Sequence, residues 1–143
     1  MLASKKFAIV ILAAGKGVRM RSSLPKALIP VCGKSMLERL IRSCNKINVQ
    51  EAVLEKVLVV IGHEKALVLE EIQKLSRILD IEVGVVEQEE QRGTGHAVQV
   101  ALPMIDSGLD FLLVLPCDLP LISENEISKL ILSSIKRSSK IST

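Results

Sequence analysis

Four short apolar runs, each followed by a stretch with helical spacing, constrain the fold of this chain more than any other feature. The runs predict strands at residues 6–12, 56–61, 81–86 and 111–115. Continuous apolar runs of this length, bounded by turn residues, are typical of buried parallel strands. Apolar residues then recur at helical spacing over residues 36–47, 68–79, 94–102 and 127–135. The chain therefore repeats a strand–helix unit four times.

Two of the predicted helices have a sequence signal at their start. Ser35 is followed three residues later by Glu38, and Ser123 by Glu126. In such a capping box the serine oxygen accepts a hydrogen bond from the N–H three residues on, and the acidic side chain reaches back to the serine. We expect one helix to begin after each serine.

Strands that alternate with helices form a parallel sheet with right-handed crossovers. We expect a three-layer α/β/α sandwich, in which a Rossmann-like, mostly parallel sheet has helices on both faces. If the four strands take the common order 3-2-1-4, strands one and four are neighbours and the direction of winding reverses between them. Ligands bind at such a switch point. The loops at residues 13–26 and 116–120 would then face each other across one crevice.

Basic residues are concentrated at the start of the chain. Seven lysines and arginines precede Glu38 with no acidic residue among them, although the formal net charge of the whole chain is only +3. Such a front end suits an anionic ligand. Phe7 and Phe111 are the only aromatic residues, so the chain lacks the stacking platforms on which many nucleic-acid-binding proteins rely. We expect a small phosphorylated ligand and no nucleic acid.

Composition indicates a soluble domain in a reducing compartment. Hydrophobic residues make up 48% of the 143 positions, which is enough for one core of Leu, Ile and Val. No apolar run approaches the ~20 residues of a membrane helix. The three cysteines are an odd number without metal-type spacing, which favours free thiols and a cytoplasmic location. The alternative is a signal peptide ending near residue 15, whose cleavage would cut through the glycine-rich segment.

The segment after the first strand, LAAGKGVRMRSSLPK, concentrates glycine and positive charge. Small residues let a backbone approach a ligand closely, and successive N–H groups can face a phosphate. Arg19 and Lys26 add two cations of different reach. The alternative interpretation is a solvated basic loop.

Two better-known glycine motifs do not fit. The dinucleotide fingerprint G-x-G-x-x-G needs a third glycine at position 20, which is Met20, and the P-loop that would end in Gly33-Lys34-Ser35 needs a glycine at position 28, which is Leu28. Neither a Rossmann dinucleotide site nor a P-loop is therefore expected.

Three segments resemble the sugar nucleotidyltransferase family, and within it the N-acetylglucosamine-1-phosphate uridylyltransferases. LAAGKGVRMRSSLPKALIPVCGKSML resembles the family signature, EQEEQRGTGHAVQVA the nucleotide-base segment, and LPCDLPLIS the metal-aspartate segment. They occur in the family's order and with similar separations, over residues 8–123. The resemblance implies one truncated nucleotidyltransferase domain at residues 1–143.

The resemblance also implies which residues form the site. Residues matching Arg19 and Lys26 contact the phosphates in this family, and the residue matching Asp118 binds Mg²⁺. The residues implied to hold the nucleotide or read its base are Leu12, Ala13, Ala14, Gly15, Gly17, Gln88, Gln91, Gly93 and Thr94.

The residues themselves leave other roles open. Gln88 and Gln91 could form a polar loop before a helix, and Asp118 could be a turn carboxylate before Pro120. His96 is expected to pack within a helix or to face solvent.

The implied reaction transfers UMP from UTP to a sugar 1-phosphate, such as N-acetylglucosamine 1-phosphate, with Mg²⁺ and release of pyrophosphate. This chain departs from the family at Cys117, where glycine is usual, and at Val18, where threonine is usual. It also lacks the sugar-binding half of the family's catalytic domain and the asparagine that is the second magnesium ligand. Two alternatives therefore stay open: a non-catalytic nucleotide-binding module, and transfer to another phosphate acceptor such as molybdopterin.

The fourth strand has a further consequence in the assumed strand order. Its sequence FLLVL would lie at the edge of the sheet, with backbone groups that no neighbouring strand covers. Because such an edge invites pairing with another chain, we expect a homo-oligomer formed through it.

Overall fold

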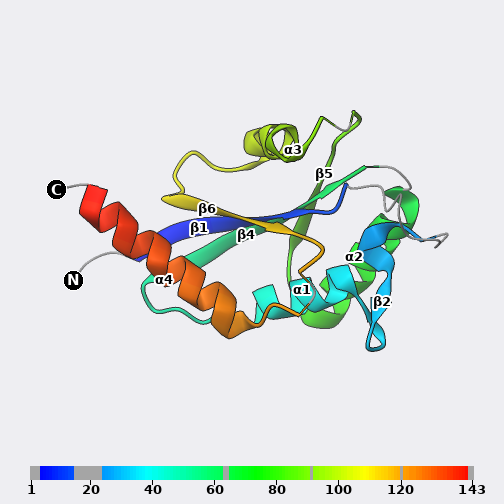
Figure 1. Ribbon diagram of the computed structural model, residues 1–143, viewed down its shortest axis with the longest axis horizontal. Coiled ribbons are helices and arrows are strands. Elements are labelled where there is room, and N and C mark those ends of the chain that lie inside the picture. Colours follow the sequence, from blue (N-terminus) through cyan, green and yellow to red (C-terminus); the bar gives the residue numbers. More distant parts are fainter. Residues whose placement is uncertain (1–3, 15–23, 63–64, 91, 120, 142–143) are drawn as a thin grey trace.

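The computed structural model describes residues 4–14, 24–62, 65–90, 92–119 and 121–141. Its main sheet contains β1 (Lys5–Leu12), β4 (Ala52–Ile61), β5 (Val83–Glu87) and β6 (Phe111–Pro116) in the order β5-β4-β1-β6 (Figure 1). All three strand pairs are parallel. The expected order 3-2-1-4 of the four apolar runs is confirmed.

Strand β4 extends well beyond its apolar run. Strand β4 begins at Ala52, four residues before the expected start at residue 56, and its first residues pair with the start of β1 through Lys5↔Ala52. The pairing has an irregularity between Phe7 and Ala8. The apolar run is interrupted by the charged residues Glu55 and Lys56, although Ala52 before them is buried and Leu54 packs against the core.

Helices cover both faces of the sheet, as expected for three layers. Helix α3 (Thr94–Ala101) lies on one side, and α1 (Met36–Asn45), α2 (Lys65–Leu79) and α4 (Glu124–Ile141) lie on the other (Figure 1). Two short 3₁₀ helices, η1 (Lys26–Leu28) and η2 (Leu102–Met104), complete the described elements. Among the residues that the structure describes, no helix is long and apolar enough to cross a membrane.

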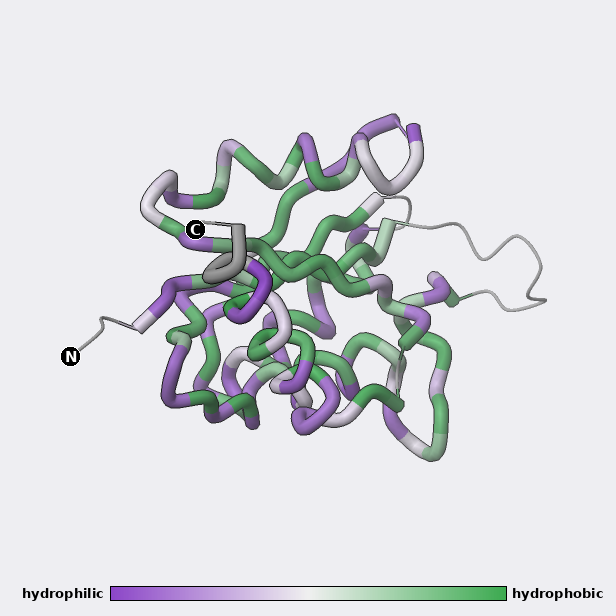
Figure 2. Tube along the Cα trace, turned by 60° about the vertical axis from the view of Figure 1, so that its left-hand side comes forward, coloured by the Kyte–Doolittle hydropathy of each residue, from purple (hydrophilic) through white to green (hydrophobic). Residues whose placement is uncertain are grey.

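The alternating side chains of β1 fill two separate cores. Phe7, Ile9 and Ile11 pack with α1, α2 and α4, whereas Val10 packs with Ala97 and other residues on the α3 side. All four of these β1 side chains are fully buried, and each contributes roughly 1.5–3 kcal/mol relative to an exposed position. Figure 2 shows the hydrophobic colour running along the central strands. This packing places β1 between the two cores at the centre of the sheet.

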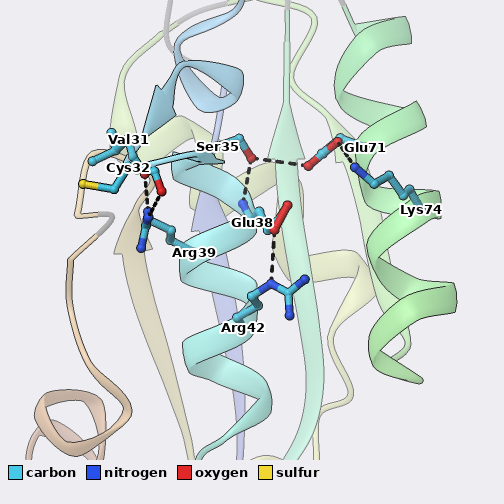
Figure 3. A network of polar contacts seen from close by, with 8 residues as sticks. All are labelled: Val31, Cys32, Ser35, Glu38, Arg39, Arg42, Glu71 and Lys74. Atoms are coloured by element: carbon cyan, nitrogen blue, oxygen red, sulfur yellow. Dashed lines mark hydrogen bonds and ion pairs between the residues drawn. The ribbon is translucent and has the colours of Figure 1, made fainter.

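Both predicted capping signals form the hydrogen bond to the serine oxygen. The Ser35 Oγ accepts a hydrogen bond from the Glu38 N–H at 3.0 Å, and the Ser123 Oγ accepts one from the Glu126 N–H at 3.2 Å. The Glu38 carboxylate does not return to Ser35 but accepts a hydrogen bond from Arg42 Nε at 3.1 Å (Figure 3). A neighbouring cation one turn further along the helix has replaced the second half of the box.

A small hairpin precedes α1 and was not predicted from the sequence. Strands β2 (Pro30–Val31) and β3 (Lys34–Ser35) are antiparallel, and the two residues between them, Cys32 and Gly33, have φ values of 51° and 83°. Positive φ at both central residues is typical of the type I′ turn that matches strand twist. The Gly33-Lys34-Ser35 sequence therefore belongs to a hairpin, in agreement with the exclusion of a P-loop.

Candidate nucleotide-binding site

A cavity of about 350 Å³ opens beside the carboxyl ends of β1 and β6, where α3 begins. Its lining consists of Leu12, Ala14, Lys26, Gln88, Gly93, Thr94, Ala97, Pro116, Cys117 and Asp118. Because β1 lies between β4 and β6, the direction of winding reverses at this point of the sheet, where ligands bind in open α/β folds. Seven of the residues that the sequence nominated line this one cavity.

The backbone at the end of β1 is held by both neighbouring segments. The Ala13 N–H donates to the Val60 carbonyl at 2.8 Å, and the Leu12 carbonyl accepts from the Cys117 N–H at 3.1 Å. Ala13 is buried on the face covered by α1, α2 and α4 and does not line the cavity. Of the nominated pair Ala13 and Ala14, the structure brings only Ala14 to the cavity wall.

Gly62, directly after β4, was missed by the sequence reasoning. A Cβ atom at this position would lie 3.0 Å from the Ala14 carbonyl oxygen and 3.2 Å from the Ala14 Cβ. Glycine therefore permits the close approach of the two strand ends beneath the cavity. No motif in the sequence marks this contact, because it depends on how β4 and β1 are paired.

The cavity wall includes a fixed amide. Gln88 is 4% exposed, and its Nε2 donates to the Gly93 carbonyl at 3.3 Å and lies 2.9 Å from the His96 Nδ1. A neutral imidazole nitrogen without a proton accepts such a hydrogen bond. His96, which was expected to pack within a helix or to face solvent, is half-buried in α3 and contacts Gln88. The signal that could have found it is the short separation of Gly93 and His96 at the start of a helix.

Gly93 has a conformation that glycine favours. Its φ is 92°, and it precedes α3 as the N-cap residue. A side chain there would be strained. The first turn of α3, which includes Thr94 and Ala97, lines the cavity, and the N-terminal end of a helix is favourable for anions.

The cavity lining also includes a pair of opposite charges. The Lys26 Nζ lies 3.4 Å from the Asp118 Oδ2, and the two side chains are 32% and 51% exposed. Lys26 begins η1 and Asp118 follows β6. Both groups are accessible enough to meet a ligand, and each compensates the charge of the other.

Cys117, the position at which the resemblance implies glycine, lines the cavity. Burial raises the pKa of its thiol, and the carboxylate of Asp118 raises it as well, while the nearby Lys26 acts in the opposite direction. The side chain is 5% exposed. Cys117 therefore contributes a small, uncharged thiol to the cavity lining at neutral pH.

The described residues include no group of three or more His, Cys, Asp and Glu side chains that could hold a metal ion. A single carboxylate, that of Asp118, is nevertheless compatible with Mg²⁺, because this ion is usually bound through one or two carboxylates together with substrate phosphates. Gly15, Gly17, Arg19 and Gln91 lie outside the described residues.

Comparison with known proteins now identifies the family. Residues 9–142 match the MobA-like NTP transferase domain. The chain belongs to this NTP transferase family. The predicted resemblance to sugar nucleotidyltransferases and the predicted α/β/α fold are both confirmed.

Relatives of this NTP transferase chain include longer proteins. It is 42% identical over 125 residues to the bifunctional protein GlmU of Prochlorococcus marinus. The matched stretch covers 87% of this chain and 25% of that protein. It is 45% identical over 123 residues to GlmU of Pseudomonas putida, and this match covers 86% of the chain and 24% of that protein. The chain thus spans about a quarter of the length of these curated relatives.

Among solved structures, the NTP transferase chain resembles HddC from Yersinia pseudotuberculosis, whose crystal structure is a complex with GMP-PN. The two chains are 25% identical, with a TM-score of 0.68, and the match covers 89% of this chain and 53% of HddC.

Proposed function

We propose that this chain forms the nucleotide-binding part of a nucleotidyltransferase that transfers UMP from UTP to a sugar 1-phosphate such as N-acetylglucosamine 1-phosphate. One observation carries the proposal: a single cavity is lined both by the buried amide of Gln88 and by the Lys26–Asp118 pair. A nucleoside triphosphate needs both, because its base presents hydrogen-bonding groups and its phosphates carry negative charge.

In this proposal, Gln88, Gly93 and Thr94 hold the nucleoside. The Gln88 amide can pair with the edge of uracil, and Gly93 lets the base lie against the backbone because it has no side chain. The hydrogen bonds of Gln88 to Gly93 and His96 fix the amide before a ligand binds. A fixed amide group, whose Oε1 can accept a hydrogen bond from the base, loses less conformational freedom on binding than a mobile one.

Lys26 would bind the phosphates, with Arg19 as a second cation. The ammonium group of Lys26 would turn from Asp118 to a phosphate oxygen, a charge-assisted contact. Asp118 would then be available to Mg²⁺. This ion would supply neutralisation of the charge on the reacting phosphates.

The proposed reaction needs no general base. A phosphate oxygen of the sugar 1-phosphate is already anionic, and it attacks the α-phosphorus of UTP. A new P–O bond forms to the sugar phosphate while the bond from the α-phosphorus to the bridging oxygen breaks, so that pyrophosphate leaves with that oxygen. The contribution of this chain is positioning and charge compensation.

The reaction is tested by measuring pyrophosphate release with UTP, GTP, CTP and ATP, each combined with a set of sugar 1-phosphates. GTP belongs in the set because HddC was crystallised with GMP-PN. Release that depends on UTP and one sugar phosphate supports the proposal. UTP binding without release in any combination would favour a non-catalytic nucleotide-binding module, and release with a different phosphate acceptor would favour transfer to that acceptor.

We further propose that two copies associate along β6. This strand lies at one edge of the main sheet, next to β1. A second copy that paired there would satisfy backbone groups of the edge.

A further inference from the structure

A second hollow, separate from the nucleotide cavity, carries concentrated positive charge. It has a volume of about 280 Å³ and lies between the hairpin, α1 and the segment before α4. Its lining consists of Lys34, Arg39, Arg42, Ser43, Lys46, Leu121, Ile122 and Ser123. None of these residues lines the nucleotide cavity, and none is acidic.

Arg39 is held in place without losing its charge. Its Nε donates to the Val31 carbonyl at 2.6 Å, and its Nη2 donates to the Cys32 carbonyl at 2.7 Å (Figure 3). Neutral carbonyls orient the planar guanidinium but do not neutralise it. No carboxylate of a described residue lies within 4.0 Å of Arg39. The hairpin therefore prepares a cation for an anionic partner.

The other three cations differ in how far they are compensated. Arg42 Nε lies 3.1 Å from the Glu38 carboxylate. Lys34 and Lys46 are exposed, and neither forms an ion pair within 4.0 Å among the described residues. Glu38 therefore offsets one of four positive charges. A bound anion would relieve the repulsion between the remaining three.

The walls of the hollow are tied together. The Ser43 Oγ donates to the Ile122 carbonyl at 2.9 Å, which connects α1 to the segment before α4. Ser123 caps α4 through its hydrogen bond from the Glu126 N–H. The cations on α1 therefore stand opposite a wall that is fixed to the same helix.

We propose that this basic hollow is a second anion-binding site, for a small ligand that carries a pyrophosphate or two phosphate groups. Three uncompensated cations call for more than one negative charge. The concave shape, with Leu121 and Ile122 on one wall, suits a small molecule better than the extended backbone of a nucleic acid. The site also gives a role to Lys34, which is one of the basic residues near the start of the chain and does not line the nucleotide cavity.

The site is tested with the whole chain by recording ¹H–¹⁵N spectra during titration with inorganic pyrophosphate at constant ionic strength. We expect saturable shifts of the Lys34, Ser43, Lys46 and Ser123 amides. The double variant Lys34→Glu/Lys46→Glu should weaken pyrophosphate binding at these amides at least tenfold. The matched control is Lys129→Glu/Lys136→Glu, which makes the same charge change at two exposed lysines of α4 outside the hollow and should leave binding unchanged.

Three results would overturn the proposal. The first is amide shifts no larger than those produced by sodium chloride at equal ionic strength. The second is equal weakening in the two double variants, because it would show a general effect of surface charge. The third is shifts produced by an RNA duplex but not by pyrophosphate.

Pyrophosphate is also the product of the proposed reaction, so it can enter the nucleotide cavity as well. The two sites are distinguished by residue, because the nucleotide cavity is followed through the Gln88 and Asp118 amides. If Lys34→Glu/Lys46→Glu disturbs the fold, Lys34→Gln/Lys46→Gln removes the same two charges without adding new ones, and it should still weaken binding. Unchanged binding in a folded Gln variant would refute the assignment.

Discussion

The Lys26 ammonium group lies 3.4 Å from the Asp118 carboxylate, across 92 positions of sequence. The pair forms because η1 and the end of β6 meet beside the carboxyl end of β1. A ligand that needs a cation for its phosphates and a carboxylate for its metal ion would meet both side by side in the cavity lining. The first two predictions separate these two groups.

Lys26→Ala should weaken UTP binding about ten- to a hundredfold. The reason is the loss of a charge-assisted contact, which contributes on the order of 1.5–3 kcal/mol. Calorimetric titration measures the affinity. The matched control is Lys129→Ala, an exposed lysine on α4, which should bind UTP like the wild type. Equal affinity of Lys26→Ala and the wild type would remove Lys26 from the site.

Asp118→Asn should preserve the fold and abolish the strengthening of UTP binding by Mg²⁺. An amide keeps the shape of the side chain but cannot neutralise a divalent cation. Thermal melts with and without UTP and Mg²⁺ provide the measurement, and Asp106→Asn, at an exposed aspartate, is the control. A large fall in melting temperature of Asp118→Asn before any ligand is added would instead support a purely structural carboxylate.

His96→Ala should reduce UTP affinity about fivefold and also reduce the preference for UTP over GTP. The variant removes a hydrogen-bond partner of the Gln88 amide, an interaction that contributes about 1 kcal/mol. Affinities for both nucleotides are compared by calorimetry with Gln99→Ala, an exposed α3 position, as control. Unaltered affinities for both nucleotides would show that His96 does not position Gln88.

The buried thiol of Cys44 should make the folded chain less stable at high pH. Burial raises the pKa of the Cys44 thiol to about 12 from an ordinary value of 9.0. Above pH 9 the unfolded chain releases this proton while the folded chain retains it, so the free energy of unfolding falls as pH rises, by up to about 1.4 kcal/mol per pH unit.

Urea denaturation between pH 7.5 and 10.5 measures this effect. The decline should be shallower in Cys44→Ala than in the wild type, and Cys32→Ala, at an exposed cysteine, should keep the wild-type slope. Identical slopes in all three proteins would contradict the assignment of the proton to Cys44.

Because β6 lies at the edge of the sheet, we expect copies of the chain to associate without gaining nucleotidyltransferase activity. Light scattering at rising concentration should give a mass above the 15.6 kDa of one chain, because β6 offers unpaired backbone groups. Turnover should remain below the ordinary enzyme range of ~1–10³ per second, because the proposal assigns this chain the nucleotide-binding part of the site and a second copy supplies that same part. A monodisperse monomer would contradict the first expectation, and ordinary turnover the second.

Much of the fold could be predicted because its signals are local. The apolar runs specified the four main strands, and Ser35 and Ser123 marked helix starts whose hydrogen bonds span three residues. Lys26, Gln88 and Asp118 were nominated from motifs, and they line one cavity because the carboxyl ends of parallel strands lie at the same edge of the sheet.

Sequence by itself determined the strand–helix alternation, since backbone preference and side-chain periodicity are decided within a few residues. Only the tertiary structure decided the contact of Gly62 with Ala14, the hydrogen bond between Gln88 and His96, and the basic hollow around Arg39. These features depend on strand pairing, loop path and helix packing, which bring together side chains from separate segments. Such distances have no periodic signature along the chain, and so the folded arrangement alone sets them.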